Sequence, residues 1–150
     1  MAFWATLPAI IVYLGRSERT RLLLVCGEKV VVVKGWLGSG KWVLPGGGLH
    51  KGEEPLRGVL RETAEETGIR LTSAQVKPLF TEPYRHIGVH FICHYFVAEL
   101  PAAAPLKAQF LEIVDLAWVD RAQLSTQNAN PDVLHALRHL AAKSTESALK

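Results

Sequence analysis

The chain is poor in the features that mark a disulfide framework or a repeat array. Two of its 150 residues are cysteines, Cys26 and Cys93. Both lie in apolar runs and lack the paired spacing of a zinc knuckle or a disulfide scaffold. Free thiols of this kind suit a reducing cytoplasm. No internal repeat or low-complexity tract is present, so we expect residues 1–150 to form a single cytoplasmic domain.

The chain also has little excess of charge of either sign. Seventeen Lys and Arg residues stand against 14 Asp and Glu residues, which leaves a formal net charge of +3. This excess is too small and scattered to predict a surface for duplex nucleic acid. It does favour an anionic substrate.

A long apolar run occurs near the start of the chain, at residues 3–15. It is too short to cross a hydrocarbon core of about 30 Å as a helix, and no basic region precedes it as in a signal peptide. Thr6 and Pro8 suit the start of an amphipathic helix. We expect the segment 1–20 to pack against the domain, with contact to a membrane surface or homodimer formation as alternatives.

Strand and helix patterns alternate along the rest of the chain. Apolar and alternating runs predict strands at residues 22–25, 30–34, 89–100 and 113–119, the first two forming a hairpin. Helical spacing occupies residues 54–67 and 131–142, and residues 143–150 resemble a frayed, flexible tail. Strands interleaved with helices indicate an α/β fold.

The helix predicted at residues 54–67 carries a cluster of acids. At about 100° per residue, Glu62, Glu65 and Glu66 share one face, where their repulsion weakens the helix by roughly a few tenths of a kcal/mol per pair. A hard cation such as Mg²⁺, which prefers oxygen ligands, would reverse that repulsion. Gly58 lies one turn earlier, and we expect it to leave room for a phosphate chain. A solvated acidic face is the alternative on these residues alone.

The loop before this helix favours the metal site. Pro45-Gly46-Gly47-Gly48 forms a glycine-rich turn directly after the apolar run 42–44. Residues at fixed spacings then follow: Gly47, Glu53, Arg61, Glu62, Glu65, Glu66 and Gly68. Residues 47–69 therefore resemble the Nudix box. Thr63 is the one departure, since an aliphatic residue is usual there, but its methyl group can still pack inward.

The resemblance covers about residues 21–124 and implies a fold, a cofactor and roles for the box residues. It implies an α/β/α sandwich with a mixed β-sheet and a hydrolase that uses Mg²⁺, with Mn²⁺ as a substitute. Glu62, Glu65 and Glu66 would bind the metal together with the backbone carbonyl of Gly47. Arg61 would bind Glu53 or another carboxylate bidentately, and Arg61 and Glu53 would orient the cluster, unless Arg61 forms only an ordinary surface pair.

A further acid is expected outside the box. Glu112, six residues before Trp118, is similar to a late Glu that binds metal or acts as the base in many Nudix members. Asp115 and Glu82 are the alternatives for this role. We therefore include Glu112 among the candidate catalytic residues.

Aromatic and basic residues supply candidates for substrate binding. Trp36, Trp42 and Tyr84 have rings that can stack on a nucleobase, although large aromatic side chains more often belong to the core. We select Trp42 and Tyr84, with Arg85 as a phosphate contact.

Three histidines, His86, His90 and His94, share one face of the strand expected near residue 90. Same-face positions on a strand lie about 6.6 Å apart per step of two residues, too wide for one tetrahedral zinc ion. The sequence therefore predicts no zinc site there.

Together these features predict metal-assisted attack of water on a phosphoric anhydride. The substrate would be a nucleoside diphosphate linked to another group, or a nucleoside triphosphate. One alternative is a nucleotide-sensing Nudix module without turnover, which the complete acid cluster argues against. Another is removal of a cap or pyrophosphate from the 5′ end of RNA, for which we would expect a stronger basic groove.

Overall fold

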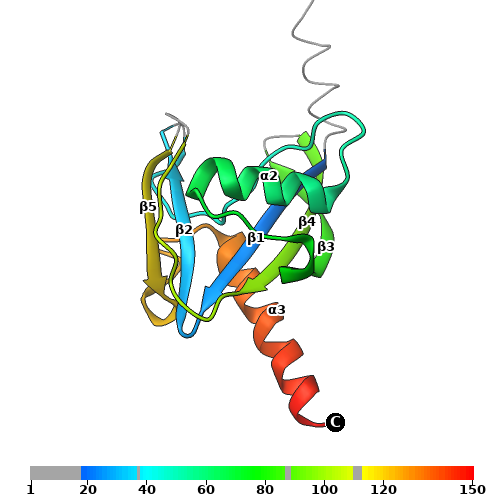
Figure 1. Ribbon diagram of the computed structural model, residues 1–150, viewed down its shortest axis with the longest axis vertical. Coiled ribbons are helices and arrows are strands. Elements are labelled where there is room, and N and C mark those ends of the chain that lie inside the picture. Colours follow the sequence, from blue (N-terminus) through cyan, green and yellow to red (C-terminus); the bar gives the residue numbers. More distant parts are fainter. Residues whose placement is uncertain (1–17, 37, 87–88, 110–112) are drawn as a thin grey trace, which may run out of the picture.

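The computed structural model describes residues 18–36, 38–86, 89–109 and 113–150 (Figure 1). The predictions for the apolar run 3–15 and for Glu112 fall outside these ranges. Within them, no helix combines the length and the apolar character needed to cross a membrane.

The described residues form one mixed sheet and two long helices. In chain order the elements are β1 (Glu18–Cys26), β2 (Lys29–Gly35), α2 (Pro55–Thr67), η1 (Ser73–Gln75), β3 (Val76–His86), β4 (Val89–Glu99), β5 (Ile113–Asp120), η2 (Arg121–Gln123) and α3 (Pro131–Ala148). The strand order is β3-β4-β1-β2-β5. Strands β1 and β4 are parallel and the other neighbours are antiparallel, so the expected mixed sheet is confirmed.

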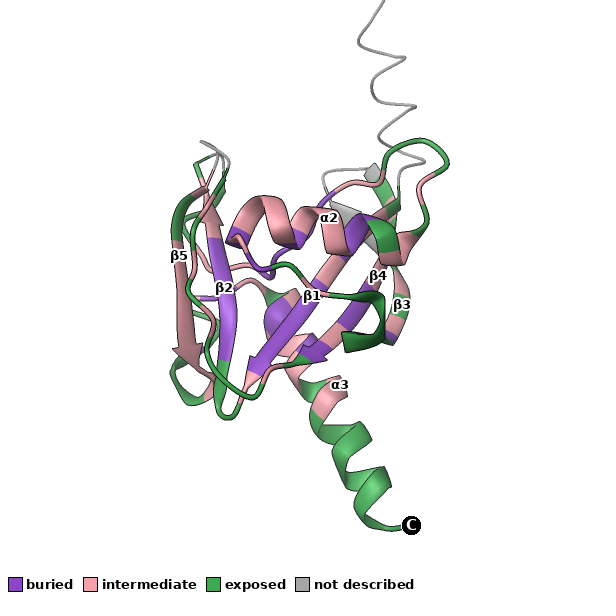
Figure 2. Ribbon diagram, in the orientation of Figure 1, coloured by how far each residue is buried: buried purple, intermediate pink, exposed green. Residues whose placement is uncertain are grey.

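The two helices cover opposite faces of the sheet, with α2 in front of it and α3 behind it in Figure 1. The central strand β1 is apolar on both sides because both of its faces are covered. Leu22 and Leu24 pack with Val59 of α2. Leu23 and Val25 belong to the cluster that contains Val133 of α3. The buried stretches of β1 and β2 mark this double core in Figure 2, and the predicted α/β/α sandwich is confirmed.

The predicted hairpin of β1 and β2 exists, but its strands pair directly over a short stretch. The paired residues are Val25 with Val30 and Cys26 with Lys29. Farther from the turn, the loop at residues 43–47 takes the place of direct pairing. Its carbonyls at Pro45 and Gly47 accept the N–H groups of Leu22 and Thr20, and its Val43 pairs with Val33 of β2. The glycine-rich turn is thus inserted as a wedge between two strands.

Strand β3 was not predicted from the sequence. This strand contains Pro78 and Pro83, and proline within a run argues against a central strand because it cannot donate a ladder hydrogen bond. It is tolerated here because β3 lies at the edge of the sheet. His86 ends β3 and pairs with Val89 of β4, so placing His86 on one strand with the two later histidines was wrong.

Helix α3 continues through Ala148, beyond its predicted end at residue 142. Residues 141–150 are exposed (Figure 2). They therefore have no apolar face from which a periodicity could be recognised. The expected irregular tail is corrected to helix as far as Ala148.

Candidate functional site

The wedge places two glycines directly against the acid face of α2. Gly46 has φ of 144°, and a Cβ there would collide with the carbonyl of Thr20. A Cβ on Gly47 would lie 2.7 Å from the carboxylate of Glu62. The N–H of Gly46 donates to Oε2 of Glu66 at 3.1 Å. Both positions require glycine because backbone and carboxylates approach so closely.

Helix α2 has local signals at both ends, and its buried residues define the face that packs on the sheet. Pro55 begins the helix, and Gly68, with φ of 75°, ends it by donating its N–H to the carbonyl of Ala64. Val59 and Thr63 are fully buried. The inward packing expected for Thr63 is therefore confirmed, although its hydroxyl has no hydrogen-bond partner.

The space beside Gly58 is occupied by protein. A Cβ at this position would overlap the side chain of Leu49 and would lie 3.2 Å from Oε1 of Glu53. The expectation that Gly58 leaves room for a phosphate chain was wrong. Its lack of a side chain instead lets the loop before α2 pack closely on the helix.

Arg61 connects the loop to three of the acids. Its Nε and Nη2 bond the two carboxylate oxygens of Glu53 at 2.9 and 2.8 Å, which is the bidentate geometry predicted. Its Nη1 donates to Glu62 at 3.0 Å and to Glu65 at 3.2 Å, and its Nη2 also reaches the carbonyl of Gly48 at 3.2 Å. The guanidinium therefore fixes the positions of several carboxylates at once.

The electrostatics divide the acids into two kinds. Hydrogen bonds from Arg61 lower the pKa of Glu53 to about 2. Burial raises the pKa of Glu62, and it raises the pKa of Glu66 to about 7 against the single backbone bond from Gly46. Charge on Glu62 and Glu66 is thus costly in the protein alone, and a bound cation would offset that cost.

The donor set at this point fits a hard divalent ion. Carboxylate oxygens of Glu62 and Glu66 lie at the wedge, beside the backbone of Gly46 and Gly47. The carbonyl of Gly47 accepts the N–H of Thr20 at 2.9 Å and, at 3.5 Å, the hydroxyl of Thr20. A metal ion at this oxygen would take the place of the long hydroxyl contact. Oxygen donors of this kind suit Mg²⁺ or Mn²⁺.

A cavity of about 280 Å³ adjoins Glu66 and Gly46. Arg19 and Arg21 of β1 line it, and so does Trp36, whose residue is 64% exposed. Neither arginine was predicted from the sequence to line the site. The signal that could have found them is the alternation of side chains along β1, which places both arginines on the same face, on either side of Thr20. Cations, a ring and a carboxylate therefore meet beside the wedge.

The residues predicted to contact the substrate lie in different parts of the fold. The ring of Trp42 packs against the core on the α3 side, with Nζ of Lys34 at 4.2 Å from its centroid. The backbone of Tyr84 and Arg85 lies in edge strand β3. Their roles remain predictions.

The alternatives to Glu112 lie on two different strands, β3 and β5. Glu82 hydrogen-bonds His135 of α3 at 3.0 Å, on the face of the sheet opposite α2. Asp115 is exposed on β5, and its Oδ1 accepts the N–H of Leu116. The role of the late acid stays a prediction.

Known proteins resemble this chain in sequence and in fold. The profile of the NUDIX domain family matches residues 7–140. The uncharacterized Nudix hydrolase YvcI of Bacillus subtilis is 34% identical over 87 residues, which are 53% of this chain and 52% of that protein. Nudix hydrolase 6 of Arabidopsis thaliana is 35% identical over 104 residues, 69% of this chain and 35% of that protein. The matches thus span about half or less of these relatives.

Among solved structures, the NUDIX domain of NrtR from Shewanella oneidensis, crystallised with ADP ribose, has the same fold. The TM-score is 0.75 at 20% identity, and the match covers 85% of this chain and 88% of that one.

Proposed function

Since the chain belongs to the Nudix family, we propose that it hydrolyses a phosphoric anhydride bond with the help of a divalent metal ion. The observation that carries the proposal is the meeting of Glu62 and Glu66 with the Gly46-Gly47 backbone, beside a cavity that Gly46 and Glu66 line. Members of the family generally use a divalent metal. The preference for Mg²⁺ over Mn²⁺ is part of the proposal.

The side chains of the box would prepare the site for the metal and the phosphates. Glu62, Glu65 and Glu66 would hold the ion, which when bound neutralises a diphosphate and lowers the pKa of a water molecule. Arg61 keeps the carboxylates of Glu62 and Glu65 oriented, and Glu53 keeps Arg61 in place. A carboxylate would take the proton of the attacking water, and Glu112 remains a predicted candidate for this role.

The cavity indicates the class of substrate. Arg19 and Arg21 provide positive charge next to Glu66, where phosphates would lie, although Asp132, 3.7 Å from Nε of Arg21, offsets part of it. Trp36 presents a partly exposed ring at the same cavity, and we favour it over Trp42 for stacking on a base. A nucleoside diphosphate linked to another group, or a nucleoside triphosphate, has both chemical features. The NrtR domain that shares the fold was crystallised with ADP ribose, a compound of the first kind.

The test is a panel of nucleotides incubated with the protein and Mg²⁺ or Mn²⁺, with products separated and hydrolysis carried out in ¹⁸O-labelled water to identify the phosphorus attacked. Glu66→Gln removes a metal ligand, and Glu54→Gln is the matched control because Glu54 is exposed and makes no side-chain capping bond. We expect turnover in the parent and in Glu54→Gln and its near loss in Glu66→Gln. If metal stabilises the protein while no compound of the panel is hydrolysed, a nucleotide sensor replaces the hydrolase as the favoured function.

A further inference from the structure

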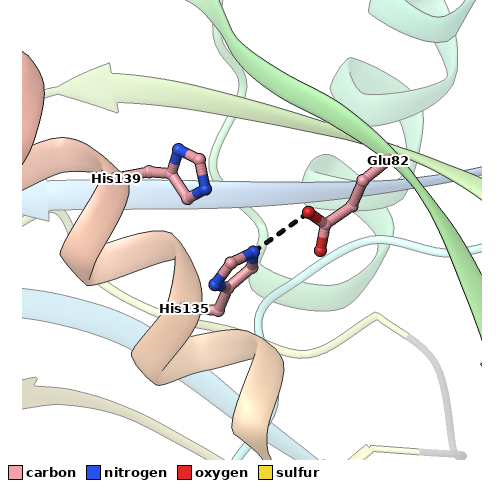
Figure 3. Close-up of side chains that lie close together, drawn as sticks. All are labelled: Glu82, His135 and His139. Atoms are coloured by element: carbon pink, nitrogen blue, oxygen red, sulfur yellow. Dashed lines mark hydrogen bonds and ion pairs between the residues drawn. The ribbon is translucent and has the colours of Figure 1, made fainter.

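A second cluster of potential metal ligands lies on the opposite face of the sheet. His135 and His139 project from α3, and Glu82 projects toward them from β3 (Figure 3). One ligand atom from each of the three residues lies within 4.8 Å of the others. We propose that these three side chains form a zinc-binding site separate from the Nudix box.

The helix and the neighbouring rings hold the two imidazoles in position. Residues four apart on a helix share a face, so His135 and His139 face β3 together. The ring of His139 stacks on Phe80 with centroids 3.9 Å apart, and His135 meets Phe80 edge-on at 5.2 Å. Phe80 itself stacks on the buried Tyr95 at 4.2 Å. The rings are therefore arranged before any metal binds, which lowers the entropy cost of binding.

The donor set matches zinc in chemistry and size. Two imidazoles and one carboxylate are a common set of protein ligands for Zn²⁺, with a fourth position left to water. With bonds of about 2.0–2.1 Å, tetrahedral ligand atoms lie roughly 3.3 Å apart. The Nε2 of His135 and Oε2 of Glu82 are already 3.0 Å apart, and the greatest separation of 4.8 Å requires a modest side-chain adjustment.

The surroundings leave access for the ion and for its water ligand. The side chains of His135 and Glu82 are 35% and 39% exposed, and a cavity of about 330 Å³ adjoins both. Asp132 lines the same cavity, with its Oδ1 buried and lacking a hydrogen-bond partner, while its Oδ2 lies 3.7 Å from Nε of Arg21, which offsets its negative charge. Arg138 also lines it and opposes a cation, but its side chain is exposed and well solvated.

A simple clamp between helix and strand is the competing explanation. The His135–Glu82 hydrogen bond would link α3 to β3 without a metal. That bond gives no role to the second imidazole, which is held beside the pair by stacking. A metal site accounts for all three residues.

The experiment measures binding of Zn²⁺, and of Co²⁺ as a coloured substitute, by calorimetry and visible absorption in the presence of excess Mg²⁺. Glu65→Gln and Glu66→Gln are introduced together in the same chain, so that the carboxylates of the Nudix box do not compete for the added ion. His139→Phe is the informative variant because it preserves a ring against Phe80 and removes the nitrogen ligands. His90→Ala is the matched control, since His90 is exposed on β4, away from the cluster.

We expect one equivalent of Zn²⁺ to bind, and one equivalent of Co²⁺ to give the intense visible bands of a four- or five-coordinate site. Loss of an outer partner of a metal ligand typically weakens affinity by about 10- to 100-fold, so His139→Phe, which loses a ligand itself, should weaken zinc binding at least about tenfold. His90→Ala should bind like the parent. Equal zinc affinity in His139→Phe and the parent, or no saturable binding in the parent, would overturn the proposal. None of these readouts depends on turnover, so the outcome is independent of the proposed hydrolysis.

Discussion

The two faces of the sheet carry two clusters of polar side chains that differ in donor chemistry and in how the chain builds them. On the α2 face, oxygen atoms from neighbouring residues of one helix meet the inserted glycine turn. On the α3 face, two imidazoles meet a carboxylate from a strand more than 50 positions away, His135 and Glu82 being 53 residues apart in sequence. The first set suits a hard ion such as Mg²⁺, and the second suits Zn²⁺.

The difference also concerns charge. Burial raises the pKa of Glu62 and Glu66, so the α2 cluster is electrostatically unfavourable until a cation arrives. The α3 cluster has a hydrogen-bonded pair and stacked rings that are stable without an ion. We therefore expect metal to matter far more on the α2 face, for both activity and stability.

The largest effect should come from removing charge at the oxygen cluster. Glu66→Gln keeps the shape of the side chain but loses the charge that would hold the proposed metal. We expect turnover to fall about 100-fold or more, equivalent to about 3 kcal/mol of barrier. Glu65→Gln should also impair turnover, but less, since the side chain of Glu65 is 32% exposed and hydrogen-bonds Arg61. Steady-state kinetics on the preferred substrate measures both, with His139→Phe as a control that leaves turnover unchanged. Retention of more than half the parent rate by Glu66→Gln would contradict the assignment.

Addition of Mg²⁺ or Mn²⁺ should raise the melting temperature. Binding to the native state alone stabilises by about 2.7 kcal/mol when the free ion is at a hundredfold excess over Kd. Glu62→Ala should weaken this response because it removes a ligand, and thermal melts with and without chelator will show it. His139→Phe should respond to Mg²⁺ like the parent. A Mg²⁺ response lost in His139→Phe and kept in Glu62→Ala would reverse the assignment of the two faces.

A methyl group added at Gly47 should have a much larger effect than one added at the next residue, Gly48. Gly47→Ala would place a Cβ 2.7 Å from the Glu62 carboxylate, whereas a Cβ on Gly48 meets nothing within 4 Å. We expect about tenfold slower turnover and weaker metal binding in Gly47→Ala, about 1.4 kcal/mol, with little change in Gly48→Ala. Kinetics and metal titration of the matched pair provide the check. Similar behaviour of the two variants would show that the close approach has no functional role.

Thr63→Val should make the protein more stable. The side chain is fully buried and its hydroxyl lacks a hydrogen-bond partner, so exchanging the hydroxyl for a methyl group removes a desolvation cost of about 1 kcal/mol or more. Chemical denaturation will measure the gain, and Thr67→Val is the contrasting variant. The Thr67 hydroxyl bonds the carbonyl of Thr63 at 2.6 Å and accepts the N–H of Ile69. Its loss should destabilise the protein.

The smallest expected effect concerns the stability of the protein at low pH. Arg61 lowers the pKa of Glu53 from its usual 4.5 to about 2. The ionised carboxylate therefore adds stability above about pH 4.5, and that stability is lost as the pH falls through this window toward 2. The melting temperature of Glu53→Gln should lie below that of the parent at neutral pH, and the gap should narrow between about pH 4.5 and 3. A gap that widens on acidification would show that the Arg61 pair is not its source.

The two clusters also differ in how far the sequence could reveal them. The acid face follows from helical spacing and the glycine-rich turn from consecutive glycines, so a local pattern was sufficient for both. An α/β fold was predictable from the same kind of pattern, and the resemblance to the Nudix box added the mixed sheet. The insertion of the turn between β1 and β2 was not predicted. The bidentate Arg61–Glu53 pair was predicted as well, because Arg61 and the acids share one short segment.

Features that depend on tertiary contacts were not predictable in this way. Leu49 fills the space beside Gly58, and no spacing rule links a loop residue to that position. Pro78 and Pro83 concealed β3, because the sequence does not show which strand will lie at the edge. With β3 missing, Glu82 had no assigned neighbour, and its approach to His135 could not be foreseen.

The insertion of the glycine turn between β1 and β2 has a consequence for motion. The N–H groups of Thr20 and Leu22 are bonded to the turn, as other strand residues are bonded to a neighbouring strand. The turn therefore cannot open without breaking part of the sheet. Its amide protection should follow global unfolding and not local loop fluctuation, so the catalytic geometry should persist for as long as the fold itself.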